Sequence, residues 1–252
     1  MATAQKRLLL LGATGETGRQ ALAAALADAR TSHVLTFGRS APTIDATIPG
    51  HAKLTHASLD YEALLAERDA GGVGPESDKL RAADADAVLI AHGTTRANAG
   101  SAERFERVDR EYVLAAAKAA RNEAKVAQSL VYVSSSGADS KSWFLYPKSK
   151  GLTEEGLAGL GYARTIIFRP GLLVVPGGRG EHRGPEKLAV AVIPRLPFVG
   201  SSLSILTPTL GRALVHAAVS STPVGRPATF GGREGFVVDN NAAQELGATA
   251  AE

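Results

Sequence analysis

Tyr146 and Lys150 stand four residues apart in the segment YPKSK. On a helix, residues at this spacing project from the same face. A phenol is a poor acid–base catalyst at neutral pH, but a neighbouring ammonium group stabilises the phenolate and lowers the pKa of the phenol toward the working range. The alternative interpretation is a helix-start aromatic residue and a solvated lysine, because the spacing alone also occurs by chance.

Three adjacent serines precede this pair and follow an apolar run at 130–133. A serine at the end of a strand can hydrogen-bond the carbonyl or hydroxyl oxygen of a substrate and hold it against a phenol. As the second residue after the apolar run, Ser135 is the predicted catalytic serine, and Ser136 is the alternative. Ser135, Tyr146 and Lys150 together predict hydride transfer with a nicotinamide cofactor, with Tyr146 as the proton donor.

A glycine pattern, GATGETG at 12–18, lies between a predicted buried strand at 7–11 and a predicted helix at 16–29. Gly12 permits a tight turn, Gly15 lets the backbone approach a pyrophosphate, and Gly18 allows close packing of helix and strand. The helix N-terminus presents free N–H groups and a positive dipole end to phosphates. The order of strand, loop and helix favours a dinucleotide site over an ordinary turn.

Arg39 follows the second predicted strand, in the segment FGRS at 37–40. NAD-binding units usually carry a carboxylate at this place, which takes the ribose hydroxyls. Here no carboxylate would repel a 2′-phosphate, and Arg39 can bind one through a bidentate charge-assisted pair. The sequence therefore favours NADP(H) over NAD(H), with a solvated loop arginine as the alternative.

Strand-like and helix-like segments alternate along the chain. Six runs are predicted strands, at 7–11, 33–37, 53–57, 87–91, 130–133 and 165–168, and helices are predicted at 16–29, 61–67, 101–122 and 147–160. The helix at 101–122 has Phe105, Val108, Tyr112 and Ala116 as its expected buried stripe. Glycine and proline at 70–76 predict a loop. This order predicts an α/β fold with a Rossmann-type, doubly wound parallel sheet.

The rhythm changes after Pro170, and the clearest later helix is predicted at 208–219. We expect one domain over 1–252, in which 172–252 contributes a small substrate-covering lobe at the carboxyl edge of the sheet. The loop at 177–183 is a candidate lid, where Arg179 and Arg183 would suit an anionic substrate. A solvated charged loop is an equal alternative.

The composition excludes several classes of protein. With 44% hydrophobic and 21% charged residues and a formal net charge of +3, the chain is typical of a soluble globular protein. The absence of cysteine excludes disulfides, a thiolate zinc site and a cysteine nucleophile, and the six histidines lack ligand spacing, so we expect no metal. Scattered basic residues and 5% aromatics argue against nucleic-acid binding. No apolar run approaches the ~18 residues that span a membrane.

Taken together, these residues resemble the atypical branch of the short-chain dehydrogenase/reductase superfamily over most of the chain. More narrowly, five segments resemble the Tat-interacting-protein oxidoreductases, and the fungal counterparts from mitochondrial proteomes are the closer match. The segments are 11–18 (LGATGETG), 93–96 (GTTR), 107–113 (RVDREYV), 134–139 (SSSGAD) and 169–173 (RPGLL).

The resemblance implies a set of contacts to NADPH. The residues implied to hold the cofactor are Gly12, Thr14, Gly15, Glu16, Thr17, Gly18 and Arg39, with Leu59 and Asp60 near adenine, Gly93 and Thr94 under the ribose and pyrophosphate, and Pro170, Gly171, Leu172 and Leu173 beside the nicotinamide. Tyr146 and Lys150 would contact the cofactor too, and Ser135, Tyr146 and Lys150 become the catalytic group. Asp109 stands where many members have an asparagine that supports the proton relay of the lysine, so the relay is either rebuilt or weakened.

The sequence thus predicts an NADPH-dependent oxidoreductase that reduces a small carbonyl substrate. The alternatives are an NADPH-sensing regulator that binds a protein partner with little turnover, and nucleotide-sugar modification on the same scaffold. His92 is expected near the cofactor rather than as a general base. Since the fold leaves no room for a cleavable presequence before the first strand, we expect the cytoplasm or the outer surface of mitochondria. The sequence leaves the oligomeric state open.

Overall fold

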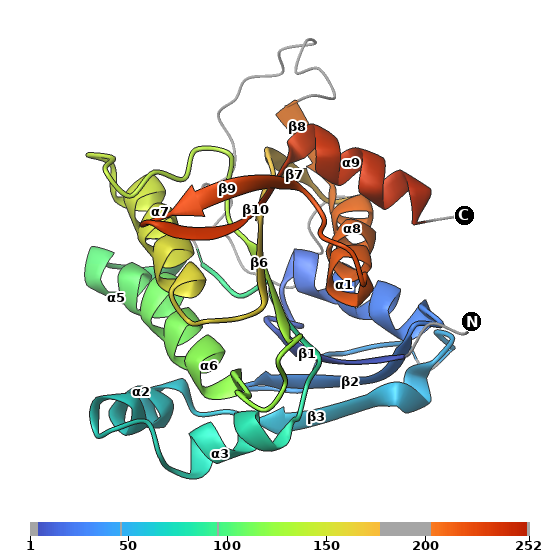
Figure 1. Ribbon diagram of the computed structural model, residues 1–252, viewed down its shortest axis with the longest axis horizontal. Helices are drawn as coiled ribbons and strands as arrows, with labels where there is room; N and C mark the ends of the chain where they lie inside the picture. The colour runs from blue at the N-terminus through green and yellow to red at the C-terminus, as the bar shows by residue number, and fades with distance from the viewer. Residues whose placement is uncertain (1–4, 46, 95, 177–202, 251–252) are drawn as a thin grey trace.

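The computed structural model describes residues 5–45, 47–94, 96–176 and 203–250. Its centre is an eight-stranded sheet in the order β3-β2-β1-β4-β5-β6-β10-β9 (Figure 1). All neighbouring strands are parallel except β10 and β9. The strands are β1 (Lys6–Leu11), β2 (Thr31–Gly38), β3 (Leu54–Ser58), β4 (Ala87–Ile90), β5 (Ser129–Val133), β6 (Arg164–Arg169), β9 (Arg226–Phe230) and β10 (Arg233–Asp239). The predicted Rossmann-type fold, in a single domain, is confirmed.

Helices cover both faces of the sheet (Figure 1). One face carries α1 (Glu16–Ala27), α8 (Thr207–Val219) and α9 (Asn240–Thr249), and the other carries α2 (Tyr61–Asp69), α3 (Pro75–Ala82), α6 (Tyr112–Ala120) and α7 (Leu145–Ala158). Along β1, Leu8 and Leu10 face the first layer, whereas Leu9 and Leu11 face the second. Both faces are buried, which explains why the first strand is a continuous apolar run.

All six predicted strands are present, but several segments differ from prediction, among them three short elements. Helix α3 begins at Pro75, inside the segment predicted as a loop. A short 3-10 turn at His51–Lys53 precedes β3, and a short helix α4 (Arg96–Ala99) follows β4. These elements are too short to show a clear hydrophobic period, so the sequence pattern does not reveal them.

The long helix predicted at 101–122 contains a widened turn. It consists of α5 (Ala102–Glu106), a π-helical turn η2 (Arg107–Glu111) and α6. The buried positions after Phe105 are Asp109 and Val113, and not the predicted Val108 and Tyr112, which are partly exposed. A π turn holds more residues than an α turn, so it shifts the buried stripe by one residue. As a result, the carboxylate of Asp109 points into the protein.

The described residues after Pro170 largely complete the main domain. Strand β10 pairs with β6, and β9 forms the edge of the sheet. Helix α8 packs against α1, and β7 (Leu172–Val174) pairs with β8 (Ser204–Leu206) in a separate two-stranded sheet. A substrate-covering role for 172–252 stays a prediction, because the candidate lid at 177–183 with Arg179 and Arg183 lies outside the described residues.

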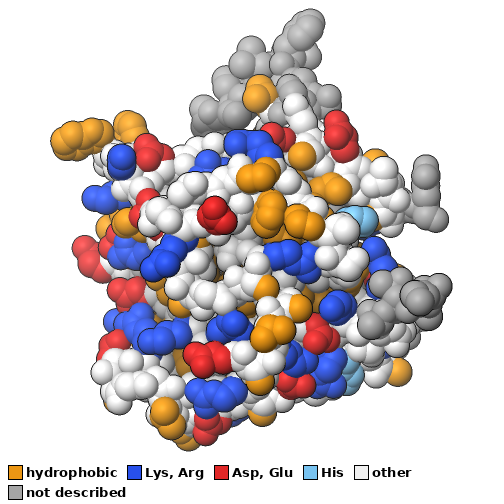
Figure 2. All heavy atoms as spheres, viewed as in Figure 1, with side chains coloured by type: hydrophobic (Ala, Val, Ile, Leu, Met, Phe, Trp, Pro, Cys, Tyr) orange, Lys and Arg blue, Asp and Glu red, His pale blue; other side chains and the backbone are white. Residues whose placement is uncertain are grey.

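Charged side chains of both signs are intermixed on the face in Figure 2, where basic residues do not gather into one patch. Within the described ranges, no helix has both the length and the apolar character needed to span a bilayer.

Candidate active site

The loop between β1 and α1 is held by close backbone contacts that only glycine permits. Gly12 has a φ of +84°, and a Cβ on it would lie 2.5 Å from the carbonyl oxygen of Ala91. A Cβ on Gly18 would overlap the carbonyl oxygen of Gly12. At Gly15 a Cβ would lie 3.5 Å from that same oxygen, which is an ordinary contact. The loop is therefore tight at its first and third glycines and open at its second.

This difference gives a test of the glycine roles. Gly18→Ala is expected to lower the free energy of unfolding by about 1–3 kcal/mol, because the added methyl group overpacks against Gly12. Gly15→Ala is expected to stay within about 1 kcal/mol of the wild type, since its methyl group would make only an ordinary contact. Urea unfolding of both variants measures the effect. Equal stabilities of the two variants would contradict the assignment.

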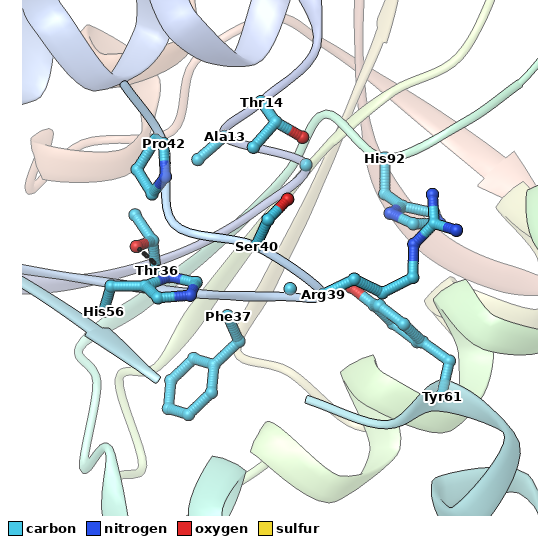
Figure 3. Close-up of a pocket in the computed structure, with 12 residues that line it drawn as sticks. Ala13, Thr14, Thr36, Phe37, Arg39, Ser40, Pro42, His56, Tyr61 and His92 are labelled. Atoms are coloured by element: carbon cyan, nitrogen blue, oxygen red, sulfur yellow. Dashed lines mark hydrogen bonds between the residues drawn. The ribbon is translucent and has the colours of Figure 1, made fainter. Parts of the chain in front are cut away.

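A pocket lies beside this loop, at the carboxyl ends of β1, β2 and β3 (Figure 3). Its lining comes from the glycine loop, from the end of β2 and from the residues that follow β3 and β4. The lining residues are Gly12, Ala13, Thr14, Thr36, Phe37, Gly38, Arg39, Ser40, Pro42, His56, Tyr61 and His92. The structure thus brings the predicted phosphate loop and Arg39 to one cavity.

Arg39 is exposed, and its charge acts on two aromatic residues of the same pocket, Tyr61 and His92. In Figure 3 its side chain runs past Tyr61 toward His92. The ion pairs found among the described residues do not include Arg39. Since no carboxylate of the described residues pairs with its guanidinium group, Arg39 is available to bind an anion.

Tyr61 and His92 belong to one aromatic cluster. The sequence analysis expects His92 near the cofactor but does not identify Tyr61 as a site residue. Their ring centroids lie 4.9 Å apart, and Tyr61 also stacks on Tyr112 at 5.0 Å. Burial, aided by the positive charges of Lys150 and Arg39, lowers the pKa of His92 to about 4. His92 is therefore neutral near pH 7, and the charges of both Arg39 and Lys150 act on it.

Leu59 and Asp60, predicted near adenine, have side chains engaged in the fold. Leu59 is 1% exposed and packs in the core. Asp60 caps helix α2, where its carboxylate accepts hydrogen bonds from the backbone N–H groups of Glu62 and Ala63. The next residue, Tyr61, is the one whose side chain lines the pocket. Its place directly after Asp60 is the signal that identifies it in hindsight.

Outside the lining of this pocket, Lys150 is buried between two polar partners. Its Nζ lies 3.2 Å from Oδ2 of Asp109 and donates a hydrogen bond of 3.0 Å to the hydroxyl of Tyr132 in β5. All three residues are at most 5% exposed. Burial by itself would lower the pKa of Lys150, but the interactions with Tyr132 and Asp109 outweigh it, and the pKa is raised. Lys150 is therefore held as a cation.

Gly93, which follows β4, fits closely against this buried pair. A Cβ on Gly93 would lie 2.8 Å from Oδ1 of Asp109 and 3.6 Å from Nζ of Lys150. The backbone N–H of Thr94 donates to the same carboxylate at 3.4 Å. Gly93 and Thr94 thus lie beside the pair of Lys150 and Asp109, and their implied place under the ribose and pyrophosphate stays a prediction.

Tyr146 lies on the first turn of α7, one turn before Lys150, and is 43% exposed. Nζ of Lys150 lies 6.0 Å from the centre of its ring, and Phe105 supports the ring from 5.9 Å. The predicted pair is therefore on one helix face, with an accessible phenol beside a buried ammonium group.

The three serines differ in their surroundings. The Oγ atoms of Ser134 and Ser135 are buried and lack a hydrogen-bond partner among the described residues. Ser136 is exposed, and its backbone N–H binds the carbonyl of Pro170 at 3.0 Å. A buried hydroxyl group without a protein partner suits a substrate oxygen, but Ser134 and Ser135 share this state, so the choice of Ser135 as the catalytic serine stays a prediction.

The predicted nicotinamide segment, Pro170, Gly171, Leu172 and Leu173, follows β6 and enters β7. Asn240 at the start of α9 holds it in place: its Oδ1 accepts from the N–H of Gly171 at 2.9 Å, and its Nδ2 donates to the carbonyl of Ser204 at 3.1 Å. The sequence analysis missed Asn240, because 69 residues separate it from Gly171.

No profile of a known protein family matches the chain. The mitochondrial protein fmp52 of Emericella nidulans is 35% identical over 218 residues, which cover 84% of this chain and 87% of the relative. A short-chain type dehydrogenase/reductase from Mycobacterium ulcerans is similar in structure, with a TM-score of 0.60 and 14% identity over 96% of this chain and 91% of that one. The Bordetella bronchiseptica enzyme WbmF in complex with NAD+ and UDP is similar with a TM-score of 0.59 and 13% identity, over 99% and 78%. The structural likenesses show a shared fold, and the sequence likeness shows the family: the chain belongs to the family of the Fmp52 proteins.

Proposed function

We propose that the protein is an NADPH-dependent oxidoreductase of the short-chain dehydrogenase/reductase type that reduces a small carbonyl compound. The observation that carries this proposal is the charged Lys150, buried against Asp109 and Tyr132 and one helical turn from the accessible Tyr146. A buried cation beside a phenol is an arrangement that serves proton transfer. Neighbours of similar fold include a short-chain type dehydrogenase/reductase and a protein bound to NAD+.

The residues of the glycine loop and of the pocket beside it fit a dinucleotide. The glycine loop leaves no room for side chains at Gly12 and Gly18 but is open at Gly15, which suits a pyrophosphate against the backbone. Thr14, Glu16 and Thr17 belong to the same loop and first helical turn, and Arg39 lies across the pocket. When bound, NADPH supplies the hydride.

The chain's own residues handle the proton and the substrate oxygen. The Oη–H of Tyr146 donates its proton to the carbonyl oxygen of the substrate as negative charge develops there. The ammonium group of Lys150 stabilises the phenolate that remains. The hydroxyl of Ser135 holds the substrate oxygen by a hydrogen bond, since it has no partner among the described residues.

The preference for NADPH rests on Arg39, and Arg39→Ala tests it. Loss of a charge-assisted pair to the 2′-phosphate is expected to weaken NADPH binding roughly 10- to 100-fold, because such bonds contribute about 1.5–3 kcal/mol. Binding of NADH, which lacks that phosphate, should change little. Titration of cofactor fluorescence measures both dissociation constants. Equal losses for the two cofactors would remove the assignment of NADP(H).

The activity itself is tested with purified protein and a panel of aldehydes, ketones and quinones, by following NADPH oxidation. Turnover of at least one compound is expected. Tight NADPH binding with silence across the panel would instead favour the regulator that senses NADPH and binds a protein partner. Failure to bind either cofactor would contradict both functions.

The relative is named as a mitochondrial protein, and we propose that this chain also associates with mitochondria. The narrower likeness to the Tat-interacting-protein oxidoreductases rests on the sequence motifs alone. Fractionation of cells that express a tagged chain tests the location.

A further inference from the structure

We propose that Tyr61 and His92 bind the adenosine part of NADPH through hydrogen bonds from side chains that have no other partner among the described residues. This inference rests on the proposed function and adds two nucleotide-binding residues to it. Neither residue belongs to the glycine loop, and both come from segments that follow different strands, β3 and β4.

The first support is that two buried polar atoms lack partners in one cavity. The hydroxyl of Tyr61 and Nε2 of His92 are buried, and neither has a hydrogen-bond partner among the described residues. Tyr61 is only 6% exposed. Both residues line the pocket that the glycine loop and Arg39 also line (Figure 3). A buried polar group without a partner is costly, and such groups are rare unless a ligand or water completes them.

The second support is that both rings are held in place. Tyr61 stacks between His92 at 4.9 Å and Tyr112 at 5.0 Å. The two other tyrosines used here for comparison have satisfied hydroxyl groups: that of Tyr112 donates to Glu62 at 2.5 Å, and that of Tyr162 donates to the carbonyl of Ala117 at 2.7 Å. The hydroxyl group of Tyr61 thus differs from those of Tyr112 and Tyr162 in being buried without a partner among the described residues.

The position of the pair identifies the part of the cofactor. The pocket runs from Gly12 and Thr14, which suit the pyrophosphate, to Arg39, which suits the 2′-phosphate. Adenosine is the part of NADPH between those two phosphates. A neutral imidazole has one donor and one acceptor nitrogen, and a phenol can do both, which matches the mixed donors and acceptors of adenosine.

The test uses 2′,5′-ADP, which carries the adenosine and both phosphate positions but no nicotinamide. The variants are Tyr61→Phe and His92→Phe, which keep an aromatic ring and remove the polar atoms. The matched controls are Tyr112→Phe, in the same aromatic stack, and Tyr162→Phe, buried outside the pocket. Calorimetry measures the dissociation constant, and thermal unfolding without ligand measures Tm.

Opposite patterns are expected for the two kinds of tyrosine. Tyr61→Phe should raise the dissociation constant of 2′,5′-ADP about 3- to 10-fold, the effect of one lost hydrogen bond, and leave the Tm of the free protein unchanged or higher. His92→Phe should weaken binding to a similar extent. Tyr162→Phe should lower the Tm and leave the dissociation constant unchanged, because it removes a bond inside the protein.

The outcomes separate this inference from the function that it rests on. If the wild type binds 2′,5′-ADP and the Tyr61 and His92 variants bind it equally well, only the inference is overturned. If the wild type binds neither 2′,5′-ADP nor NADPH, the proposed function is overturned as well. A lowered Tm of Tyr61→Phe with unchanged affinity would make that hydroxyl a structural group and contradict its role in binding.

Discussion

Tyr146→Phe is expected to lower kcat by about 10²- to 10⁴-fold, the range in which a positioned acid contributes to catalysis, with little change in NADPH affinity. The substitution removes only the Oη–H of a ring that is 43% exposed and rests against Phe105, so the fold should be unaffected. Steady-state kinetics with the best compound of the carbonyl panel measures kcat, and fluorescence titration measures the dissociation constant of NADPH.

The separation of turnover from binding is what makes this variant informative. Lys150 keeps its contacts with Asp109 and Tyr132 in the variant, because neither contact involves the phenol of Tyr146. The buried charge of Lys150 and its contacts therefore persist while the proton donor is lost. Tyr162→Phe, which removes another tyrosine hydroxyl outside the candidate active site, serves as the control and should keep its kcat. Retained turnover in Tyr146→Phe would reject its role as the proton donor.

Much of the fold follows from local sequence signals. Runs such as 8–11 and 87–91 are apolar at every position because both faces of a parallel sheet are buried, and this pattern needs no tertiary information. The glycine loop is equally local: the strand, the turn and the helix that it joins are adjacent in the chain. The Tyr146 and Lys150 pair was predictable for the same reason, since four residues on one helix set its geometry.

The missed elements lie where local signals are weak or misleading. Strands β9 and β10 form a hairpin whose turn contains Gly231 and Gly232, both with positive φ. A Gly-Gly pair between two strand-like runs is a recognised hairpin signal, so both strands can be predicted from the sequence. The π turn at 107–111 is different, because α periodicity predicts Tyr112 as buried and nothing in the pattern indicates the extra residue.

The site shows the same division between local and long-range information. Lys150 was found from its spacing, but its partners come from elements distant in the chain: Tyr132 from β5 and Asp109 from the π turn. A tyrosine inside an apolar strand looks like ordinary core. Only the three-dimensional structure shows that its hydroxyl group accepts a hydrogen bond from the ammonium group of Lys150. Because the carboxylate of Asp109 pairs directly with Lys150, it contributes to the support of the lysine.

Asp109→Ala is expected to lower the free energy of unfolding at pH 7 by about 3–5 kcal/mol, the typical effect of removing one partner of a buried ion pair. Asp109 and Lys150 are both nearly inaccessible, so water cannot solvate the ammonium group that is left without its partner. Glu106→Ala is the matched control. Glu106 lies one turn earlier and pairs with Arg110 in a more exposed ion pair, whose loss should change stability by less than about 1 kcal/mol. Urea unfolding measures both variants.

The dependence of this loss on pH follows from Lys150. In the wild type its pKa is raised in the folded state, so the stabilisation is fully present below the unfolded value of about 10.4 and is lost only as the pH rises through the higher folded value. Without Asp109, one of the interactions that raise this pKa is lost while burial still opposes the charge, so the folded pKa falls. The variant then gains stability relative to the wild type as the pH rises, and the difference between them narrows from pH 7 to pH 10.5. Asp109→Asn keeps the shape of the side chain, so its loss of stability at pH 7 should be smaller. Its difference from the wild type should also narrow as the pH rises. A difference below 1 kcal/mol at pH 7, or one that stays constant with pH, would show that Asp109 does not hold the charge of Lys150.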